Sequence, residues 1–572
     1  MSLAKPALPA KRRQVGERSP YIVQAASVAA ARAAVLRVGG QITGDLSIIR
    51  AVGVSLDDYQ LEQLQSADIP ALRIFPDSAV KASSLTGALP ETYYPTESAA
   101  SELHVGGVTG AGVTVAVLDS GLWAQHGPLQ TSANGNNGRI LAQYDVLLAQ
   151  QDPSAYGNPL FETYSNNIGD PYGHGTHVSS IIGSSGIATT GKYQGVAPGV
   201  NLVSVRVLDS TGAGTYFNVI RGIQWVLAQK MRYNIRVINL SLGAPPQSPY
   251  WADPLDQAVM AAWQGGIVVV AAAGNRGPTP MTIGAPGNTP YIITVGAVTD
   301  NYQPTKPSQY TLASFSSSGP TYEGFVKPDV VGMGGHVLAY SPSNGTLALE
   351  FPSWYDPAHD DFTMSGTSQA TAVVSGVVAL MLQVNPYLTP DTVKCRLMSS
   401  AHPAVNANGT LAYTVFQQGA GLVSARDAVY STATGCANLG LSVSLDLAGL
   451  KHYGGRANQD SAGNFYIMAD STNTSLTGSL LSSFGLGGLQ SVPIVGNLLW
   501  GVPLLGDGLL WNGTYTSGTG YTWSNGYTWS NGYTWSNGYT WSNGYTWSNG
   551  YTWSNGYTGG DSSAGSTVPH QE

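Results

Sequence analysis

The sequence predicts an α/β protein with a mostly parallel central sheet and helices on both faces. A small α+β unit precedes this core, and a repeat-containing C-terminal extension follows it. Between residues 106 and 435, short β-branched runs alternate with helical stretches. The runs are apolar throughout, as expected of parallel strands that are buried on both faces. They read VTVAVLDS, NLVSVRVL, RVINLSL, GIVVVAAAG and YIITVGAV.

The composition excludes several classes of protein. Only 10% of the 572 residues are charged, against ~25% in an average domain, and 43% are hydrophobic. Such a supply of apolar residues argues against a wholly disordered chain. The net charge of −8 and the lack of a basic patch argue against a nucleic-acid partner. Low charge, 71 glycines and many aromatic residues favour a stable, loop-rich extracellular protein.

Residues 1–20 form an N-terminal extension in which we predict no secretory signal. The basic run at 11–13 is not followed by the apolar stretch of ~7–15 residues that such a signal needs. We also predict no transmembrane segment, because no run of ~18 uninterrupted apolar residues occurs.

Residues 21–82 are predicted to form the small α+β unit. Strand-like and helical segments alternate in the order YIVQAAS, a helix over 26–37, LSIIRAVGVSL, DDYQLEQLQSA and ALRIFPDSAV. Asp57 and Asp58 open the second helix, since acidic residues favour the first helical turn. Residues 83–105 contain Ser, Thr and Pro and are predicted to be an exposed linker.

Cys395 and Cys436 are the only two cysteines, which excludes a disulfide framework or a cysteine zinc cluster. They are either one disulfide that closes a separation of 41 residues or two inert buried thiols. The sequence leaves both alternatives open.

Three regions follow the predicted α/β core: 436–510 is rich in Gly, Leu and Ser, 511–558 contains six copies of YTWSNG, and 559–572 is a polar tail. A period of six is even, so Tyr and Trp of every copy would share one face of an extended strand. Asn-Gly favours hairpin turns, which predicts a stack of antiparallel hairpins. A solenoid and a disordered low-complexity tail are the alternatives. The aromatic faces suggest contact with cell-wall material or polysaccharide.

Three motifs carry the residues best suited to catalysis. Asp119 ends a buried strand in VTVAVLDSGL, His174 precedes an apolar helix in DPYGHGTHVSSIIG, and Ser368 opens a helix in SGTSQATAVVSGVVALML. Strand ends and helix starts are where open parallel sheets place their ligand sites. Taken singly, each residue is also compatible with a structural role, such as a turn or helix cap.

Together, in the order Asp, His and Ser, the motifs resemble those of the subtilase family of serine endopeptidases. The resemblance covers about residues 106–430. It extends more loosely to 21–82, which resembles the inhibitory prodomain of subtilases; a stand-alone ferredoxin-like domain is the alternative. It implies a subtilisin-like fold and hydrolysis of peptide bonds in protein substrates. It also implies a precursor that cuts itself within 83–105 and is inhibited by its own prodomain.

The resemblance also implies the role of each catalytic residue. Ser368, rather than Ser365, corresponds to the nucleophile, and His174 corresponds to the general base that takes its proton. Asp119 would hold the imidazole in the correct tautomer and stabilise its charged form. Asn275, in AAAGNRG, would donate to the developing oxyanion together with the backbone N–H of the nucleophile. His177, one turn beyond His174, is expected to have a structural role.

Substrate binding in this family follows strand addition, in which an extended peptide pairs with exposed backbone. The segments that the resemblance assigns to this role contain Gly212, Ala213 and Gly214 on one side and Ser241, Leu242 and Gly243 on the other. The specificity pocket would be walled by 241–243 and 272–275, which includes Ala273 and Gly274. No acidic residue is assigned to this wall, so a strict preference for Lys or Arg is not supported.

The segment GTSQATAVVSG departs from the family pattern. Gln369, Ala372 and Val373 stand where the family has Met, Pro and His. A proline shapes the first turn of a helix, so its loss is expected to shift Ser368 slightly. The alternative function is therefore a catalytically weak or inactive surface or adhesion protein on a subtilase scaffold.

The chemistry requires no cofactor. Structural calcium fits the family, although the sequence does not identify its ligands. The resemblance places the protein outside the cell or at the cell surface, although no signal peptide is visible.

Overall fold

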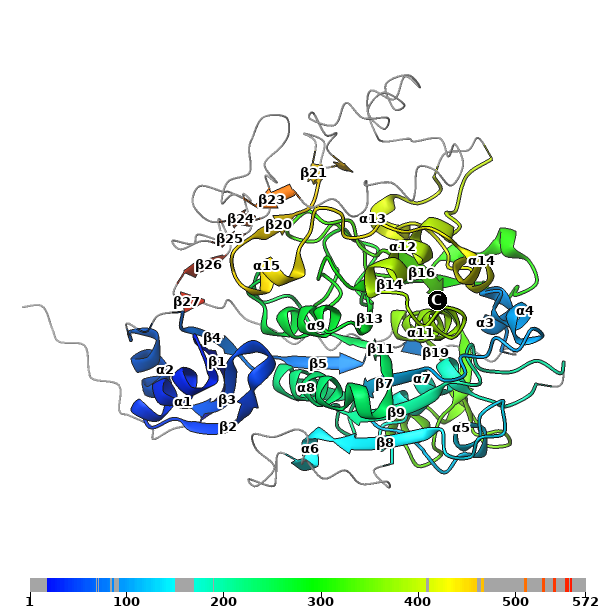
Figure 1. The fold of residues 1–572 in the computed structure, drawn as a ribbon, viewed down its shortest axis with the longest axis horizontal. Helices are drawn as coiled ribbons and strands as arrows, with labels where there is room; N and C mark the ends of the chain where they lie inside the picture. The colour runs from blue at the N-terminus through cyan, green and yellow to red at the C-terminus, as the bar shows by residue number, and fades with distance from the viewer. Residues whose placement is uncertain are drawn as a thin grey trace, which may run out of the picture. The chain divides into compact units, whose positions relative to one another are not determined.

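The computed structural model in Figure 1 divides into two compact units, Met1–Asp77 and Ser78–Glu572. The structure describes residues 18–67, 69, 71–82, 85–86, 92–149, 169–188, 190–407, 411–459, 464–467, 509–511, 527–529, 539–541, 551–554 and 556–557. Most of the predicted N-terminal extension, much of 436–510, most of the repeats and the polar tail lie outside the described residues.

The first unit is a four-stranded antiparallel sheet with the order β2-β3-β1-β4 and two helices. Its elements are β1 (Ser19–Gln24), α1 (Val28–Arg37), β2 (Gln41–Leu46), η1 (Ser47–Ile49), β3 (Ala51–Leu56), α2 (Asp58–Gln65) and β4 (Arg73–Pro76). Side chains from both helices and the sheet, including Val23, Val35, Val52 and Leu64, form its core.

The prediction for this unit missed one strand. The segment LSIIRAVGVSL is not continuous, because the 3-10 turn η1 ends at Arg50, which has a left-handed backbone with φ 57°. This turn reverses the chain, so β2 and β3 pair with each other. The predicted helix start at Asp57 is confirmed: Asp57 and Gln60 form a reciprocal capping box.

The second unit is built on an eight-stranded sheet, mostly parallel, with the order β15-β14-β13-β11-β7-β9-β8 and β16 paired to β14. Neighbouring strands pair in parallel except β14 and β15. The strands are β7 (Thr114–Asp119), β8 (Ile140–Asp145), β9 (Asn201–Arg206), β11 (Ile235–Leu240), β13 (Val268–Ala272), β14 (Ile293–Thr299), β15 (Thr311–Leu312) and β16 (Val330–Met333). This confirms the predicted parallel sheet.

Helices cover both faces of this sheet. Figure 1 shows α8 (Tyr216–Tyr233) and α9 (Pro254–Gln264) on one side of it. On the other side lie α7 (His174–Gly183) and α11 (Thr367–Val384), which pack against each other. Other helices surround this core: α3 (Tyr94–Glu97), α4 (Ala100–His104), α5 (Gly127–Gln130), α6 (Val146–Ala149), α10 (Thr346–Glu350), α12 (Pro390–Ser400), α13 (Val415–Gln418), α14 (Ala425–Tyr430), η3 (Pro307–Gln309) and η4 (Pro352–Trp354).

Helix α11 is the central helix of the second unit. Among the described residues it is the one helix long and apolar enough to cross a membrane, but 89% of it is buried inside the protein. Its apolar character is therefore accounted for by packing against β11, β13, β14 and β16. Ser368 lies in its first turn.

Two small sheets lie at the ends of the core elements. One has the order β10-β5-β12, and the other joins β17, β19 and β18, with β6 paired to β19. Their strands are β5 (Ala79–Ala82), β6 (Leu85–Thr86), β10 (Ala213–Thr215), β12 (Leu242–Gly243), β17 (Val337–Tyr340), β18 (Tyr355–Asp356) and β19 (Asp361–Ser365). The sequence placed a boundary after residue 82, whereas the structure divides after Asp77. The reason is that β5 pairs with β10 and β12 of the second unit.

The chain continues into the same unit beyond residue 435, where the sequence placed the end of the catalytic domain. A disulfide joins Cys395 in α12 to Cys436, with their Cα atoms 5.1 Å apart. The buried Asp446 accepts hydrogen bonds from the hydroxyls of Tyr250 (2.6 Å) and Tyr291 (2.9 Å). The elements of this region are α15 (Val443–Leu447), β20 (His452–Gly454), β21 (Ala457–Gln459), β22 (Phe465–Ile467) and β23 (Leu509–Trp511).

The described parts of the repeats form short strands. They are β24 (Tyr527–Trp529), β25 (Tyr539–Trp541), β26 (Tyr551–Ser554) and β27 (Gly556–Tyr557). The strands β24, β25 and β26 pair in parallel, and only β26 and β27 pair antiparallel. The connections between these strands lie outside the described residues, so the hairpin stack, the solenoid and the disordered tail stay predictions.

Candidate active site

Asp119 and His174 form a buried pair. The Nδ1 atom of His174 lies 2.8 Å from Oδ1 of Asp119, and both side chains are at most 1% exposed. Asp119 is the last residue of β7, and His174 is the first residue of α7. The same carboxylate oxygen accepts a hydrogen bond from the backbone N–H of Ser120 at 2.8 Å. The strand end and the helix start therefore meet as the sequence predicted.

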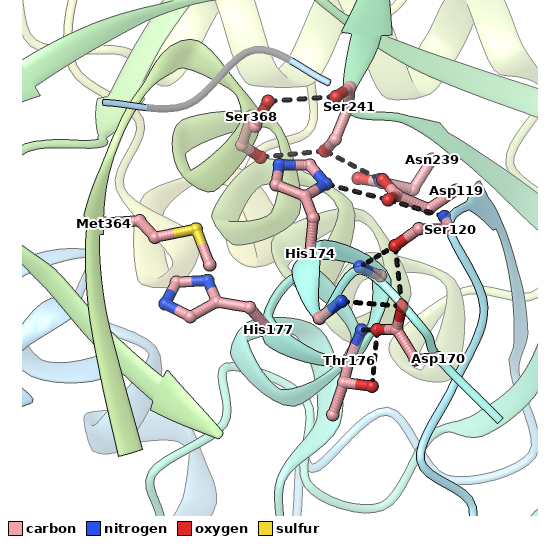
Figure 2. Close-up of polar contacts among 12 residues, drawn as sticks. Asp119, Ser120, Asp170, His174, Thr176, His177, Asn239, Ser241, Met364 and Ser368 are labelled. Atoms are coloured by element: carbon pink, nitrogen blue, oxygen red, sulfur yellow. Dashed lines mark hydrogen bonds and ion pairs between the residues drawn. The ribbon is translucent and has the colours of Figure 1, made fainter. Parts of the chain in front are cut away.

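Asp170 fixes the start of α7 relative to the end of β7. Its Oδ1 accepts hydrogen bonds from the Ser120 hydroxyl and the Gly173 N–H, both at 2.8 Å. Its Oδ2 accepts from the N–H and the hydroxyl of Thr176, both at 2.7 Å. Four donors on one carboxylate hold the residues on either side of the Asp119–His174 pair, as Figure 2 shows.

The glycine after His174 is required by a close approach of two backbones. A Cβ atom on Gly175 would lie 2.3 Å from the carbonyl oxygen of Gly121, a distance that no side chain tolerates. The Gly175 N–H also donates to the Ser120 hydroxyl at 2.9 Å. The motif GHG thus lets α7 lie against the loop that follows β7.

Ser368 is fully buried in the first turn of α11 and is held by Ser241. Its Oγ donates to the carbonyl oxygen of Ser241 at 2.9 Å, and the Ser241 hydroxyl donates to the carbonyl oxygen of Ser368 at 2.9 Å. The amide of Asn239 donates to the Ser241 hydroxyl at 2.9 Å and accepts from Ser375 of α11 at 2.9 Å. These contacts connect the end of β11 to the first and third turns of α11.

His174 lies between Asp119 and Ser368 in the view of Figure 2. Its Nε2 is buried and has no hydrogen-bond partner among the residues that the structure describes. An imidazole with Nδ1 on a carboxylate and Nε2 unengaged is a base held in one orientation. In this structure the Ser368 hydroxyl donates a hydrogen bond to the carbonyl oxygen of Ser241. A proton transfer to His174 therefore requires this hydroxyl to rotate away from that carbonyl.

Asn275 is oriented by Thr367, the residue before Ser368. Its Oδ1 accepts from the Thr367 N–H at 3.0 Å and from the Thr367 hydroxyl at 2.8 Å. The same hydroxyl accepts from the Gly274 N–H at 3.2 Å. Because the oxygen of the amide is engaged, its nitrogen is the group that can donate elsewhere, as an oxyanion donor must.

His177 is buried away from this pair. Its Nε2 lies 2.9 Å from the carbonyl of Phe362 and 3.2 Å from that of Val337, in β19 and β17. Burial, and after it the nearby His174, lowers the pKa of His177 to about 3. Gln369 lies next to it, with its amide nitrogen 3.5 Å from Nδ1 of His177. A neutral imidazole that bonds to backbone carbonyls agrees with the expected structural role.

The two predicted substrate strands flank a segment of the chain itself. β5 pairs antiparallel with β10 on one side, with Val80 opposite Gly214, and with β12 on the other, with Lys81 opposite Gly243. Ala213 and Leu242 also take part in these pairings. Antiparallel pairing on both sides has the form of strand addition. That a peptide substrate binds here stays a prediction.

The other predicted substrate-binding residues have different positions. Gly212 lies in the turn before β10, with φ +72°, where a Cβ atom would lie 2.4 Å from the ring of Tyr172. Ser241 lies just before β12 and forms hydrogen bonds with Ser368 rather than with β5. Ala273 is buried, and its N–H and carbonyl bond to Val295 (2.9 Å) and Gly284 (3.1 Å).

No group of three or more His, Cys, Asp or Glu side chains suited to a metal ion occurs within the described part of the chain. The calcium expectation therefore stays a prediction.

Sequence reasoning missed Asp170, Asn239 and Thr367. Asp170 lies four residues before His174 in DPYGHGTH, so its place beside the motif was the available signal. The sequence contains no motif that identifies Asn239, because its partners Ser241 and Ser375 come together only in the folded protein.

Comparison with known proteins agrees with this geometry. The model of the subtilase family matches residues 110–421, and the chain therefore belongs to the subtilase family of serine proteases. Serine protease AprX of Bacillus subtilis is 40% identical over 297 residues, which cover 50% of this chain and 60% of AprX. Subtilisin E of the same organism is 31% identical over 365 residues, which cover 64% of this chain and 78% of that protein.

The fold is similar to that of fervidolysin from Fervidobacterium pennivorans, a keratinolytic enzyme related to subtilisin. The TM-score is 0.57 at 19% identity, over 79% of this chain and 65% of fervidolysin. This likeness supports the predicted subtilisin-like fold.

Proposed function

We propose that this protein is a serine endopeptidase that hydrolyses peptide bonds of protein substrates through Asp119, His174 and Ser368. The observation that carries the proposal is the buried 2.8 Å contact between Asp119 and His174, with Nε2 of the imidazole unengaged on the side of Ser368. A nucleophile, a base and a group that orients the base are the three parts that acyl transfer needs.

In the proposed mechanism the Ser368 hydroxyl leaves the carbonyl of Ser241 and turns to Nε2 of His174. His174 takes its proton as the oxygen attacks the substrate carbonyl, and Asp119 stabilises the imidazolium that forms. The proton then passes to the leaving amine. Water then attacks the acyl-enzyme. His174 takes a proton from the water and gives it to Oγ of Ser368 as the acid product leaves.

Asn275 is proposed to stabilise the oxyanion. Thr367 holds its Oδ1, so the Nδ2 group is directed by a residue adjacent to the nucleophile. The backbone N–H of Ser368 is the proposed second donor. Loss of one such donor costs about 10²–10³-fold in kcat in comparable sites.

We further propose that the chain is a precursor that processes itself and is inhibited by its own residues 21–82, and that it acts outside the cell. The pairing of β5 with β10 and β12 supports inhibition, because it occupies both substrate strands. The Cys395–Cys436 disulfide supports an oxidising, extracytoplasmic location. Contact of the YTWSNG repeats with polysaccharide is part of the same proposal.

The test compares hydrolysis of an unstructured protein substrate by the wild type and by Ser368→Ala. We expect Ser368→Ala to lose up to about 10⁶-fold in kcat, because it removes the nucleophile and little else. Ser365→Ala is the matched control and should retain most activity, since the Ser365 hydroxyl accepts from the N–H of His336 (2.9 Å). Equal, low activity of wild type and Ser368→Ala would favour the inactive scaffold instead.

A further inference from the structure

The carboxylate of Asp446 joins two loops of the second unit. Its Oδ2 accepts hydrogen bonds from the hydroxyls of Tyr250 at 2.6 Å and Tyr291 at 2.9 Å. Asp446 is only 2% exposed, and the centroids of the two tyrosine rings lie 6.4 Å apart. Asp446 belongs to α15, which lies beyond the residues 110–421 that match the family model. The contact is therefore made from outside the matched part of the chain.

Each tyrosine ends a segment that begins at the predicted specificity pocket. Residues 244–250 follow directly on β12, and residues 284–291 lead into β14. At the pocket, Ala244 and Ala285 exchange backbone hydrogen bonds of 3.0 and 2.8 Å. The two segments are thus joined by their backbones at one end and by Asp446 at the other.

The segment 284–291 lies against both predicted walls of the pocket. On one wall, the N–H of Gly284 donates to the carbonyl oxygen of Ala273 at 3.1 Å. On the other wall, a Cβ atom on Gly243 would lie 3.3 Å from the carbonyl oxygen of Ala285. Any movement of this segment therefore changes the space between the two walls.

Both tyrosine hydroxyls keep the protons that they donate. Burial, and after it the charge of Asp446, raises the pKa of Tyr250 and that of Tyr291 well above the usual value for tyrosine. Removing the carboxylate would leave two buried hydroxyl groups without this acceptor, which is costly in free energy. The loops that carry these hydroxyls would then shift until the hydroxyls find other partners.

We propose that Asp446 is a positioning residue that sets the width of the predicted specificity pocket through Tyr250 and Tyr291. The proposal rests on the proposed endopeptidase function and deepens it, because it names a determinant of side-chain selectivity. A pocket with fixed walls discriminates between side chains by size, whereas walls that can move adapt to several side chains.

The test uses peptides that differ only in the residue that donates the carbonyl of the cleaved bond, which is Ala, Leu, Phe or Lys. The processed wild type is compared with Asp446→Ala. We expect KM for the preferred peptide to rise about tenfold with little change in kcat, because pocket contacts bind the ground state and the transition state alike. The ratio of kcat/KM between the preferred and the poorest peptide should fall by about the same factor.

His452→Phe is the matched control. Nδ1 of His452 lies 2.7 Å from Oδ1 of Asp446, the oxygen that neither tyrosine uses, and its ring stacks on Trp251 with centroids 4.9 Å apart. A phenyl ring keeps the stacking and leaves both tyrosine contacts in place, so selectivity should equal that of the wild type. Asp446→Asn keeps an acceptor oxygen and should restore most of the selectivity that Asp446→Ala loses.

Tyr291→Phe removes a single hydroxyl and keeps the ring. It should change selectivity in the same direction as Asp446→Ala, and it provides the test if Asp446→Ala does not fold. Thermal unfolding of each variant shows whether it is folded.

Three results would overturn the proposal and leave the endopeptidase function intact. They are a wild type that cleaves all four peptides equally well, folded Asp446→Ala and Tyr291→Phe proteins with the wild-type ratio between peptides, and an equal loss of selectivity in His452→Phe. A wild type that hydrolyses none of the peptides, nor an unstructured protein substrate, rejects the endopeptidase function and this proposal with it.

Discussion

At the scale of single residues, the catalytic candidates could be predicted from the sequence because each lies inside a contiguous motif. Asp119, His174 and Ser368 were predicted from such motifs, and the structure brings the first two into contact at 2.8 Å. Their roles stay predictions. Asn239 could not be predicted, because its contacts with Ser241 and Ser375 exist only when β11 and α11 are packed together.

Asp170 offers a residue-scale prediction. Asp170→Asn replaces the carboxylate that accepts four hydrogen bonds with a neutral amide. The start of α7, and with it His174, is then held less firmly. We expect kcat to fall by about 10²-fold with little change in KM, since small displacements of a catalytic group cost that much.

Asp209→Asn is the matched control for Asp170→Asn. Asp209 accepts from the N–H groups of Thr211 (2.8 Å) and Ala213 (3.1 Å) and so supports the turn before β10. Its loss should raise KM more than it lowers kcat. If Asp170→Asn changed only KM, its proposed positioning of His174 would be wrong.

At the scale of elements, apolar runs predicted the parallel sheet well, because strands buried on both faces have a distinctive composition. The prediction missed the break between β2 and β3, because a turn at Arg50 adopts a left-handed backbone without a glycine to signal it. It also could not assign residues 79–82 to the second unit. The pairing of β5 depends on strands that are more than 100 residues away in the sequence.

Helix α3 makes stability depend on pH through Glu97. Burial, and after it the charge of Asp300, raises the pKa of Glu97 to about 8, so the folded state keeps a proton that the unfolded state releases. The stabilisation is complete below about pH 4.5 and is lost as the pH rises through about 8. Its size is on the order of a few kcal/mol.

The measurement is the free energy of unfolding between pH 5 and pH 9, in a Ser368→Ala background that prevents self-digestion. Glu97→Gln should reduce the loss of stability on the alkaline side, because a neutral amide has no proton to release. Glu102→Gln is the control, since this neighbouring carboxylate in α4 is 56% exposed. Identical pH dependence in all three proteins would contradict the role of Glu97.

At the scale of the whole molecule, the residues proposed for catalysis and the YTWSNG repeats are far apart in the sequence. The proposed catalytic residues lie between 119 and 368, and the repeats begin at residue 521 and contain no charged side chain. The sequence predicted this division from composition alone. The packing of Asp446 and the Cys395–Cys436 disulfide shows that the second unit nevertheless continues past residue 435.

Truncation after residue 511 should leave hydrolysis of small peptides unchanged, because it retains β23 and its pairing with β20. It should reduce retention on insoluble polysaccharide or cell-wall material, since aromatic faces stack on sugar rings. Both forms are compared at equal concentration in a pull-down. Equal retention would remove the proposed anchoring role of the repeats.

The central claim is that Ser368 is a nucleophile activated by His174. The most direct measurement is reaction of the processed protein with a fluorophosphonate, followed by mass spectrometry of its peptides. We predict a single adduct on Ser368 and none on Ser365. An adduct on Ser365, or an unlabelled Ser368 in a folded, processed protein, would contradict the claim.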